Sequence, residues 1–195
     1  MSDMEKSKVA QTAQPEIVPY DDSMYDELKA LDIEVEAQVL QDAGVPEADA
    51  LHSARALYDD RYRATLRRLT QEPRSYTRVA RVGGHIVGWC FASKANRDNL
   101  GQDGLDEEGF APANTIGSIG VSQGFRHQGI ATALTKRFLD EVADPTAPTT
   151  IYAKASAVAF WRRMGFDVVD TDHEPERVGD VEVPMLNMKR EAEES

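Results

Sequence analysis

The sequence of 195 residues has a single cysteine, Cys90, so no disulfide can form within the chain. Basic residues are also scarce, because 22 Lys and Arg stand against 34 Asp and Glu and give a formal net charge of −12. This charge argues against nucleic acid as the main partner, since binding to phosphates requires a basic surface. The longest stretch without charge, residues 109–125, contains Pro, Asn, Ser and Gln, so no transmembrane helix is predicted.

The composition is that of a folded globular protein, with 41% apolar and 29% charged residues. Residues 1–13 mix Asp, Glu and Lys without an apolar stretch and therefore do not resemble a signal peptide. We expect a cytoplasmic protein with a disordered tail over residues 1–14, one domain over residues 15–190 and an acidic tail over residues 191–195.

Two helices are predicted in the N-terminal half, after a short strand over residues 16–20. Apolar residues recur at spacings of three and four from Met24 to Val39, and Gly44 and Pro46 end this pattern. A second apolar stripe lies within a predicted helix over about residues 47–69. We interpret this stripe as part of the core rather than as a ligand surface.

The apolar periodicity changes to two after Pro73. Alternating residues over 76–82 and 86–91 flank Gly83 and Gly84, which predicts a hairpin with a two-residue turn. Residues 93–113 are rich in Gly, Asp, Asn and Glu, and loops of this length are usually functional or disordered.

A strand, a turn and a helix are predicted between residues 115 and 142. The turn contains Gly124 and Gly129, and the helix after it carries Ile130, Leu134, Phe138 and Val142 on one face. Backbone N–H groups at such a turn and at the start of a helix form a pocket for an anion such as pyrophosphate. The two glycines alone fit a simple turn equally well. Gly117, Gly120, Gly124 and Gly129 fit neither the dinucleotide-binding pattern Gly-x-Gly-x-x-Gly nor the full phosphate-loop pattern Gly-x-x-x-x-Gly-Lys-Ser/Thr.

Two blocks of the sequence resemble the GNAT superfamily of acyl-CoA-dependent N-acyltransferases. Residues 126–131 read Arg-His-Gln-Gly-Ile-Ala and match the family's pyrophosphate-loop pattern Arg/Gln-x-x-Gly-x-Gly/Ala. Residues 160–166 correspond to the family's Phe-Tyr-x-x-Leu-Gly-Phe block, with Trp161 in place of Tyr. The blocks stand in the family's order and spacing. The resemblance extends over about residues 17–188 and includes a closing strand near residues 181–188.

The resemblance implies an α/β fold with a mixed, mostly antiparallel sheet of six or seven strands flanked by about four helices. It implies that acetyl-CoA binds as a co-substrate between two central strands. The implied cofactor-binding residues are Ile119, Gly120, Val121, Arg126, His127, Gln128, Gly129, Ile130, Ala131 and Phe160. In the family the acyl group passes directly to an amine, so the expected acceptor is a small amine or a peptide amine. Homodimers are frequent in the family, and a homodimer is therefore open here.

The catalytic residues are not predicted, because the sequence departs from the family pattern. Many relatives use the Tyr of the second block to protonate the CoA sulfur, but an indole N–H such as that of Trp161 does not do so at neutral pH. Trp161 either lines the CoA channel or packs in the core. Lys154 stands where relatives often carry Asn, and the uncharged segment 114–118 stands where many carry Glu. Ser118, Tyr152 and Trp161 are weak catalytic candidates, each with an ordinary structural role as the alternative.

No metal site is predicted, because His52, His85 and His173 have no Cys or His partner at ligand spacing. Cys90 lies in an apolar strand and is interpreted as a small hydrophobic residue of the core rather than as a nucleophile.

We therefore predict an N-acetyltransferase that uses acetyl-CoA and a primary amine. The alternative is a non-catalytic acyl-CoA-binding sensor or interaction module, which Trp161 and the missing Glu favour. In relatives the acceptor pocket is framed by segments that correspond to residues 42–50 and 173–180. The acidic residues near it attract a cationic amine or are only solvated: Asp103, Asp106, Glu107, Glu108, Glu174, Glu176 and Asp180. A third reading, transfer to aminoacyl-tRNA, would require a basic face, for which Arg61, Arg63, Arg67 and Arg68 offer a local patch.

Overall fold

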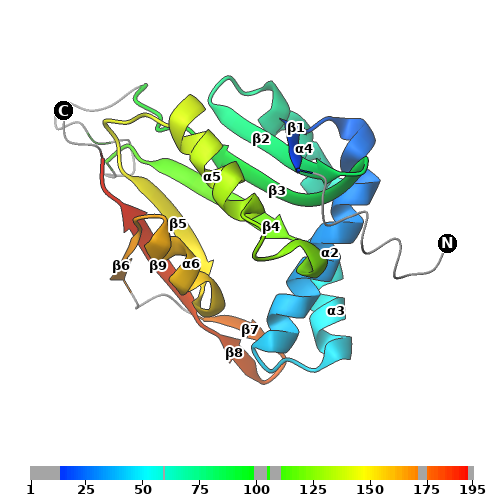
Figure 1. Ribbon diagram of the computed structural model, residues 1–195. Coiled ribbons are helices and arrows are strands. Elements are labelled where there is room, and N and C mark those ends of the chain that lie inside the picture. Colours follow the sequence, from blue (N-terminus) through cyan, green and yellow to red (C-terminus); the bar gives the residue numbers. More distant parts are fainter. Residues whose placement is uncertain (1–13, 59, 99–104, 106–110, 171–174, 193–195) are drawn as a thin grey trace.

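A seven-stranded sheet forms the centre of the computed structural model, which describes residues 14–58, 60–98, 105, 111–170 and 175–192 (Figure 1). Its order is β1-β2-β3-β4-β5-β9-β6, and of its pairings only β4 with β5 is parallel. The strands are β1 (Glu16–Pro19), β2 (Ser75–Val82), β3 (His85–Ser93), β4 (Asn114–Val121), β5 (Thr149–Lys154), β6 (Asp167–Asp170) and β9 (Met185–Arg190). The predicted mixed, mostly antiparallel sheet is confirmed. Of the predicted tails over residues 1–14 and 191–195, residues 1–13 and 193–195 lie outside the described residues.

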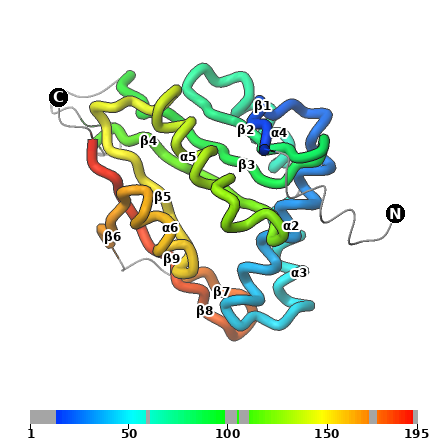
Figure 2. Tube along the Cα trace, in the orientation of Figure 1, coloured from blue at the N-terminus to red at the C-terminus, as the bar shows by residue number. Residues whose placement is uncertain are grey.

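Helices cover both faces of the sheet (Figures 1 and 2). Leu28 and Leu31 of α2 (Tyr25–Asp42) and Leu66 of α4 (Asp60–Gln71) pack on one face, against residues such as Trp89. On the other face, α5 (Ile130–Glu141) and α6 (Val158–Arg163) cover a larger core. Three short 3-10 turns link these elements: η1 (Asp22–Met24), η2 (Gln123–Phe125) and η3 (Ala155–Ala157).

The predicted helix over residues 47–69 is two helices, α3 (Glu47–Ala56) and α4, so the described residues contain five α-helices rather than about four. The physical reason is that the two halves of the apolar stripe belong to different cores. Ala50 and Ala54 pack with the hairpin of β7 (Glu176–Val178) and β8 (Val181–Val183), whereas Leu66 packs on the main sheet. One straight helix cannot face both.

Two other predictions from the sequence concern the strands. The hairpin of β2 and β3 is confirmed, because Gly83 and Gly84 form its turn with φ angles of +59° and +88°. The single closing strand expected near residues 181–188 is wrong, since Pro184 separates β8 from β9. Proline has no N–H to donate to a strand ladder.

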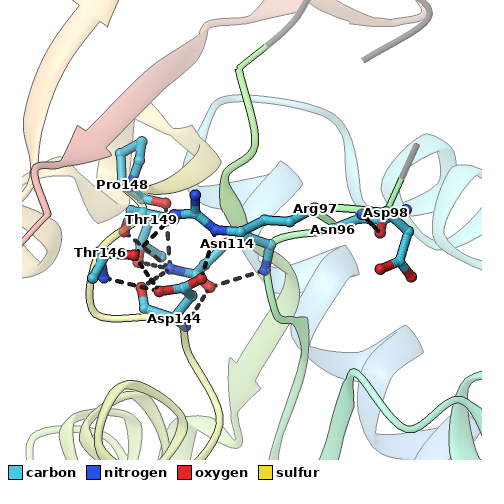
Figure 3. Close-up of polar contacts among 10 residues, drawn as sticks. Asn96, Arg97, Asp98, Asn114, Asp144, Thr146, Pro148 and Thr149 are labelled. Carbon is cyan, nitrogen blue, oxygen red and sulfur yellow. Dashed lines mark hydrogen bonds and ion pairs between the residues drawn. The ribbon is translucent and has the colours of Figure 1, made fainter. Parts of the chain in front are cut away.

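The buried side chain of Asn114 joins β4 to the segment before β5 (Figure 3). Its Nδ2 donates to the carbonyl oxygens of Asp144 at 2.9 Å and Ala147 at 3.1 Å. Its Oδ1 accepts from the backbone N–H groups of Ala95 at 3.0 Å and Asp144 at 2.8 Å. The first of the two residue pairs between β4 and β5 is Asn114 with Thr149, so this amide holds the end at which the two strands meet.

We predict that Asn114→Ala lowers the free energy of unfolding by about 3 kcal/mol, because it leaves several buried backbone groups without partners, each at a cost of about 1–3 kcal/mol. Urea denaturation measures this change. Asn96→Ala is the matched control, since the Asn96 side chain accepts an exposed hydrogen bond from the backbone N–H of Asp98, and we expect a change within about 0.5 kcal/mol. Equal effects of the two substitutions would contradict the role assigned to Asn114.

Candidate functional site

One edge of β4 is left without a neighbouring strand over most of its length. On one side β4 pairs with β3 from Thr115 to Val121, but on the other side only Asn114 and Thr115 pair with β5. The register with β3 shifts at Gly117, which is an extra residue between the pairs of Ile116 and Ser118. Beyond this bulge the two parallel strands diverge (Figure 1). Among the described residues, the backbone groups of Ile119, Gly120 and Val121 that face away from β3 therefore have no strand partner. The Val121 carbonyl oxygen accepts from the Arg126 side chain, and the remaining groups are available to an extended ligand.

Trp89 of β3 holds this part of β4 in place through one hydrogen bond and through close packing of its ring. Its indole Nε1 donates to Ser118 Oγ at 2.9 Å. Its ring lies so close to Gly120 that an added Cβ there would be 2.2 Å from the ring. Gly120 is therefore required by packing, and the Ser118 hydroxyl has a structural partner.

The turn between β4 and α5 has the geometry of an anion site. His127 and Gly129 adopt positive φ angles of +62° and +81°. No side chain caps the first turn of α5, which starts at Ile130, and an added Cβ at Gly129 would meet nothing within 4 Å. Uncapped N–H groups, the positive end of the helix dipole and open space together suit a phosphate group.

The side chains of this turn mostly point back to the protein. Arg126 Nε donates to the carbonyl oxygen of Val121 at 3.3 Å, and its guanidinium lies 4.0 Å from the Asp42 carboxylate at the end of α2. Gln128 Nε2 donates to the carbonyl oxygen of Gly124 at 3.1 Å. Ile130 is buried in the core, whereas His127 is exposed. The backbone is thus the part of residues 126–131 that is most open to a ligand.

The aromatic residues of the second sequence block lie in α6 and just after it, in the core on the face of the sheet that α6 covers. Trp161 is 2% exposed and makes edge contacts with the rings of Phe160 at 4.8 Å and Phe166 at 5.1 Å between centroids. Phe160 is half-buried at the edge of this core. Tyr152 of β5 lies on the opposite face of the sheet and is 57% exposed.

A pocket of about 450 Å³ lies on the face of the sheet that α2 and α4 cover. Its wall includes the polar side chains of Asp32, Glu36, Tyr58 and Tyr62 and the apolar side chains of Leu57, Leu66, Leu69 and Phe91. It reaches β4 at Thr115, Gly117 and Ser118. It therefore touches β4 directly before the stretch that has no partner strand on one edge. We call it the Asp32 pocket.

The Asp32 carboxylate is buried in this wall and is 7% exposed. Asp32 Oδ2 accepts from the hydroxyl of Tyr62 at 3.1 Å, and the Tyr58 hydroxyl also donates to this carboxylate. Burial raises the pKa of Asp32 to about 6, although both hydrogen bonds oppose the shift. Burial and the neighbouring carboxylate also raise the pKa of both tyrosines, so both hydroxyls remain donors at neutral pH.

Lys154 connects three elements at the rim of the pocket. Its Nζ forms a short ion pair with Glu36 of α2 and lies 3.3 Å from Glu176 of β7. The α2–α3 turn and the β7–β8 hairpin also share a small core that includes Val45 and Val178. The segments expected to frame the acceptor therefore contact each other. Of the acidic residues expected near the acceptor, Asp180 is exposed. Five others lie outside the described residues: Asp103, Asp106, Glu107, Glu108 and Glu174.

Sequence reasoning missed Asp32, although a signal was present. Asp32 lies four residues after Leu28 and next to Leu31, on the buried side of α2. A carboxylate in an apolar stripe requires partners, and the Tyr58 and Tyr62 hydroxyls supply them. Both tyrosines belong to the apolar stripe predicted over residues 47–69, whose spacing alone indicates core residues.

Two of the four residues of the arginine patch share one acidic partner. Arg63 and Arg67 both bind the carboxylate of Asp22, at 2.8 and 2.6 Å. Part of the positive charge of this helix face is therefore compensated, and the absence of a nucleic-acid partner stays a prediction.

None of the helices in the described part of the chain has the length and apolar character of a membrane span. Within the same ranges, no three His, Cys, Asp or Glu side chains gather closely enough to hold a metal ion.

Comparisons with known proteins agree with this geometry. A family model described as the acetyltransferase (GNAT) family matches residues 42–166. No curated protein matches the sequence. Among solved structures, the chain is similar to the PaiA N-acetyltransferase of Thermoplasma acidophilum in complex with coenzyme A, with 12% identity and a TM-score of 0.64 over 91% of this chain and 99% of that one.

Two further structures are similar over most of their length. The ribosomal-protein-S18-alanine N-acetyltransferase of Escherichia coli has 14% identity and a TM-score of 0.60, over 93% of this chain and 96% of that one. Arabidopsis thaliana NAA60 in complex with a bisubstrate analogue has 14% identity and a TM-score of 0.63, over 93% of this chain and 100% of that one. At these identities the likeness shows the fold.

We predict that Asp32 destabilises the protein above pH 6. Because its pKa is raised in the folded state, from 3.8 to about 6, the folded state binds this proton more tightly than the unfolded state does. Stability therefore falls as the pH rises from about 4 to 6, by roughly 2–3 kcal/mol. Asp32→Asn removes this titration, so its free energy of unfolding at pH 8 should exceed that of the wild type by a similar amount.

Urea denaturation at pH 4.5 and 8 measures the effect. Glu34→Gln is the control, since it removes the same charge from an exposed position of α2, and it should change stability by less than about 0.5 kcal/mol at either pH. A loss of stability at pH 8 in the Asp32 variant would show that its charged form is favoured by the fold.

Proposed function

The chain belongs to the acetyltransferase (GNAT) family, and on this premise we propose that it is an N-acetyltransferase that transfers an acetyl group directly from acetyl-CoA to a primary amine. The observation that carries the proposal is the divergence of β4 from β5 next to the turn that begins α5. An extended thioester and its pyrophosphate require these two features side by side.

The residues present fit the donor. The unpaired edge of β4 over Ile119–Val121 would bind the pantetheine arm by backbone hydrogen bonds. The turn over Arg126–Ala131 would hold the pyrophosphate, because it offers uncapped N–H groups, the positive helix end and open space above Gly129. The Arg126 guanidinium, oriented by Asp42 and the Val121 carbonyl, adds positive charge at the base of the turn. Phe160 lies at the edge of the core next to Trp161.

Acetyl-CoA would supply an activated acyl carbon: the amine, in its uncharged form, would bond to this carbon as the C–S bond breaks, the nitrogen would lose a proton to solvent, and CoA would leave as a thiolate that solvent protonates. The chain contributes binding and orientation, because Trp89 fixes the Ser118 hydroxyl and the backbone at Gly120. We assign no catalytic role to the earlier candidates. Trp161 is packed among Phe160 and Phe166, and Ser118 accepts the indole hydrogen bond. An amine acceptor, a cytoplasmic location and homodimerisation remain predictions.

We predict that Gly129→Trp weakens acetyl-CoA binding at least tenfold in isothermal titration calorimetry, because the indole would fill the space where the pyrophosphate is expected. Gly84→Trp is the matched control. Gly84 also has a positive φ, of +88°, and open space around it, but it lies in the β2–β3 turn. Equal affinities of the two variants would refute the assignment of the turn after β4.

Release of CoA in the presence of a panel of primary amines tests the reaction itself. We expect release well above the rate of hydrolysis for at least one amine. The packed Trp161 favours a second candidate, a non-catalytic acyl-CoA-binding module. Tight binding of acetyl-CoA without turnover on any amine would support that module instead.

A further inference from the structure

We propose that the Asp32 pocket is the acceptor site, and that it selects small primary amines with an apolar body and no carboxylate beside the amine. The inference rests on the proposed function, since only a transferase requires an acceptor. Binding of an amine to the pocket can nevertheless be measured without turnover.

The position of the pocket fits an acceptor. Direct transfer requires the amine nitrogen to come within about 3–3.5 Å of the acyl carbon, so the acceptor must approach β4. The Asp32 pocket reaches β4 at Gly117 and Ser118, directly before the residues proposed to hold the donor. A second cavity of about 280 Å³, which includes Asp144 and Arg190, has no residue of β4 in its wall.

The chemistry of the pocket fits an ammonium group. The Asp32 carboxylate accepts hydrogen bonds from two tyrosine hydroxyls. The charge of Lys154 acts to lower its pKa from a distance, but Lys154 is ion-paired with Glu36 and Glu176, and within the described residues no Lys, Arg or His forms an ion pair with Asp32 itself. A buried carboxylate without a cation in direct contact gains a charge-assisted hydrogen bond when an ammonium group enters. Tyr58 and Tyr62, whose ring centroids are 4.6 Å apart, also line the pocket, and an aromatic ring attracts a cation that comes within about 6 Å of its face.

The charge balance of the rim disfavours acids. Lys154 is shared between Glu36 and Glu176, so its charge is already compensated. Asp32 and Glu36 both line the pocket, whereas Lys154 and Glu176 are not part of its wall, so the charged side chains of the wall are carboxylates. A ligand carboxylate would meet net negative charge, and an amine without one would be attracted.

The remaining wall sets the body of the amine. Leu57, Leu66, Leu69 and Phe91 give apolar surface on the side of α4 and β3. Leu57 is 53% exposed, which leaves an apolar group at the mouth. The volume of about 450 Å³ lies within the range of about 300–1,000 Å³ for small-molecule sites. A single aryl or alkyl chain is therefore the expected body.

Calorimetric titration with phenethylamine and n-hexylamine, with and without saturating CoA, tests the proposal. The comparison ligands are phenethyl alcohol, which lacks the charge, and phenylalanine, which adds a carboxylate to the same body. We expect at least one amine to bind at least tenfold more tightly than either comparison ligand. Asp32→Asn should weaken that amine at least tenfold, whereas Glu34→Gln should leave it unchanged. The acetyl-CoA affinity should be the same in both variants.

Three results would overturn the proposal: no binding of either amine to the wild type, equal binding of phenylalanine, or equal amine affinities of the Asp32 and Glu34 variants. The turnover assay distinguishes a failure of the acceptor-site proposal from a failure of the proposed transferase function. Amine binding that depends on Asp32 without CoA release would retain the pocket and refute the transferase. Turnover whose KM for the amine is unchanged by Asp32→Asn would retain the transferase and place the acceptor elsewhere.

Discussion

The arrangement of the central strands depends on one buried amide. Asn114 binds backbone groups of Ala95, Asp144 and Ala147, and thereby fixes the end at which β4 and β5 meet. Because the strands are joined there and pair at only two residues, the rest of β4 has an edge without a neighbour. Unpaired strand edges usually invite other chains. Here the open edge is internal to the sheet, between two strands of the same molecule, where only a slender extended group can enter.

The face of the sheet that carries the Asp32 pocket depends on a balance between the cost of burying a carboxylate and the hydrogen bonds that it accepts. Asp32 is buried at an energetic cost that its two tyrosine donors offset only in part, since its pKa remains raised. A carboxylate held in its less favourable form within a cavity is typical of functional sites, where local stability is given up for binding. Lys154 belongs to the same balance, because its ion pairs connect α2, β5 and the β7–β8 hairpin around the rim.

Much of the fold was predictable because its signals are local. The Gly83–Gly84 turn and the apolar spacing of α2 and α5 follow from backbone preferences and periodicity, and the structure has them as predicted. The break between α3 and α4 was not predictable from local signals, because the two halves of one apolar stripe pack into two different cores. The candidate site divides in the same way. The turn at Gly129 is visible as a motif, whereas the Asp32 pocket joins residues 32, 58, 62 and 117 and exists only in the folded chain.

The bulge at Gly117 and the turn at Gly129 present mainly backbone atoms, whereas most of the wall of the Asp32 pocket consists of side chains from α2, α4, the segment before α4, and β3. Backbone atoms are common to all residue types, so one side of β4 tolerates divergence as long as a few glycines are kept. Each replacement on α2 or α4, in contrast, reshapes the other side. The scaffold thus separates a constant backbone surface from a variable side-chain surface. A new specificity can arise by exchange of helix side chains, without a change in the strand that both surfaces share.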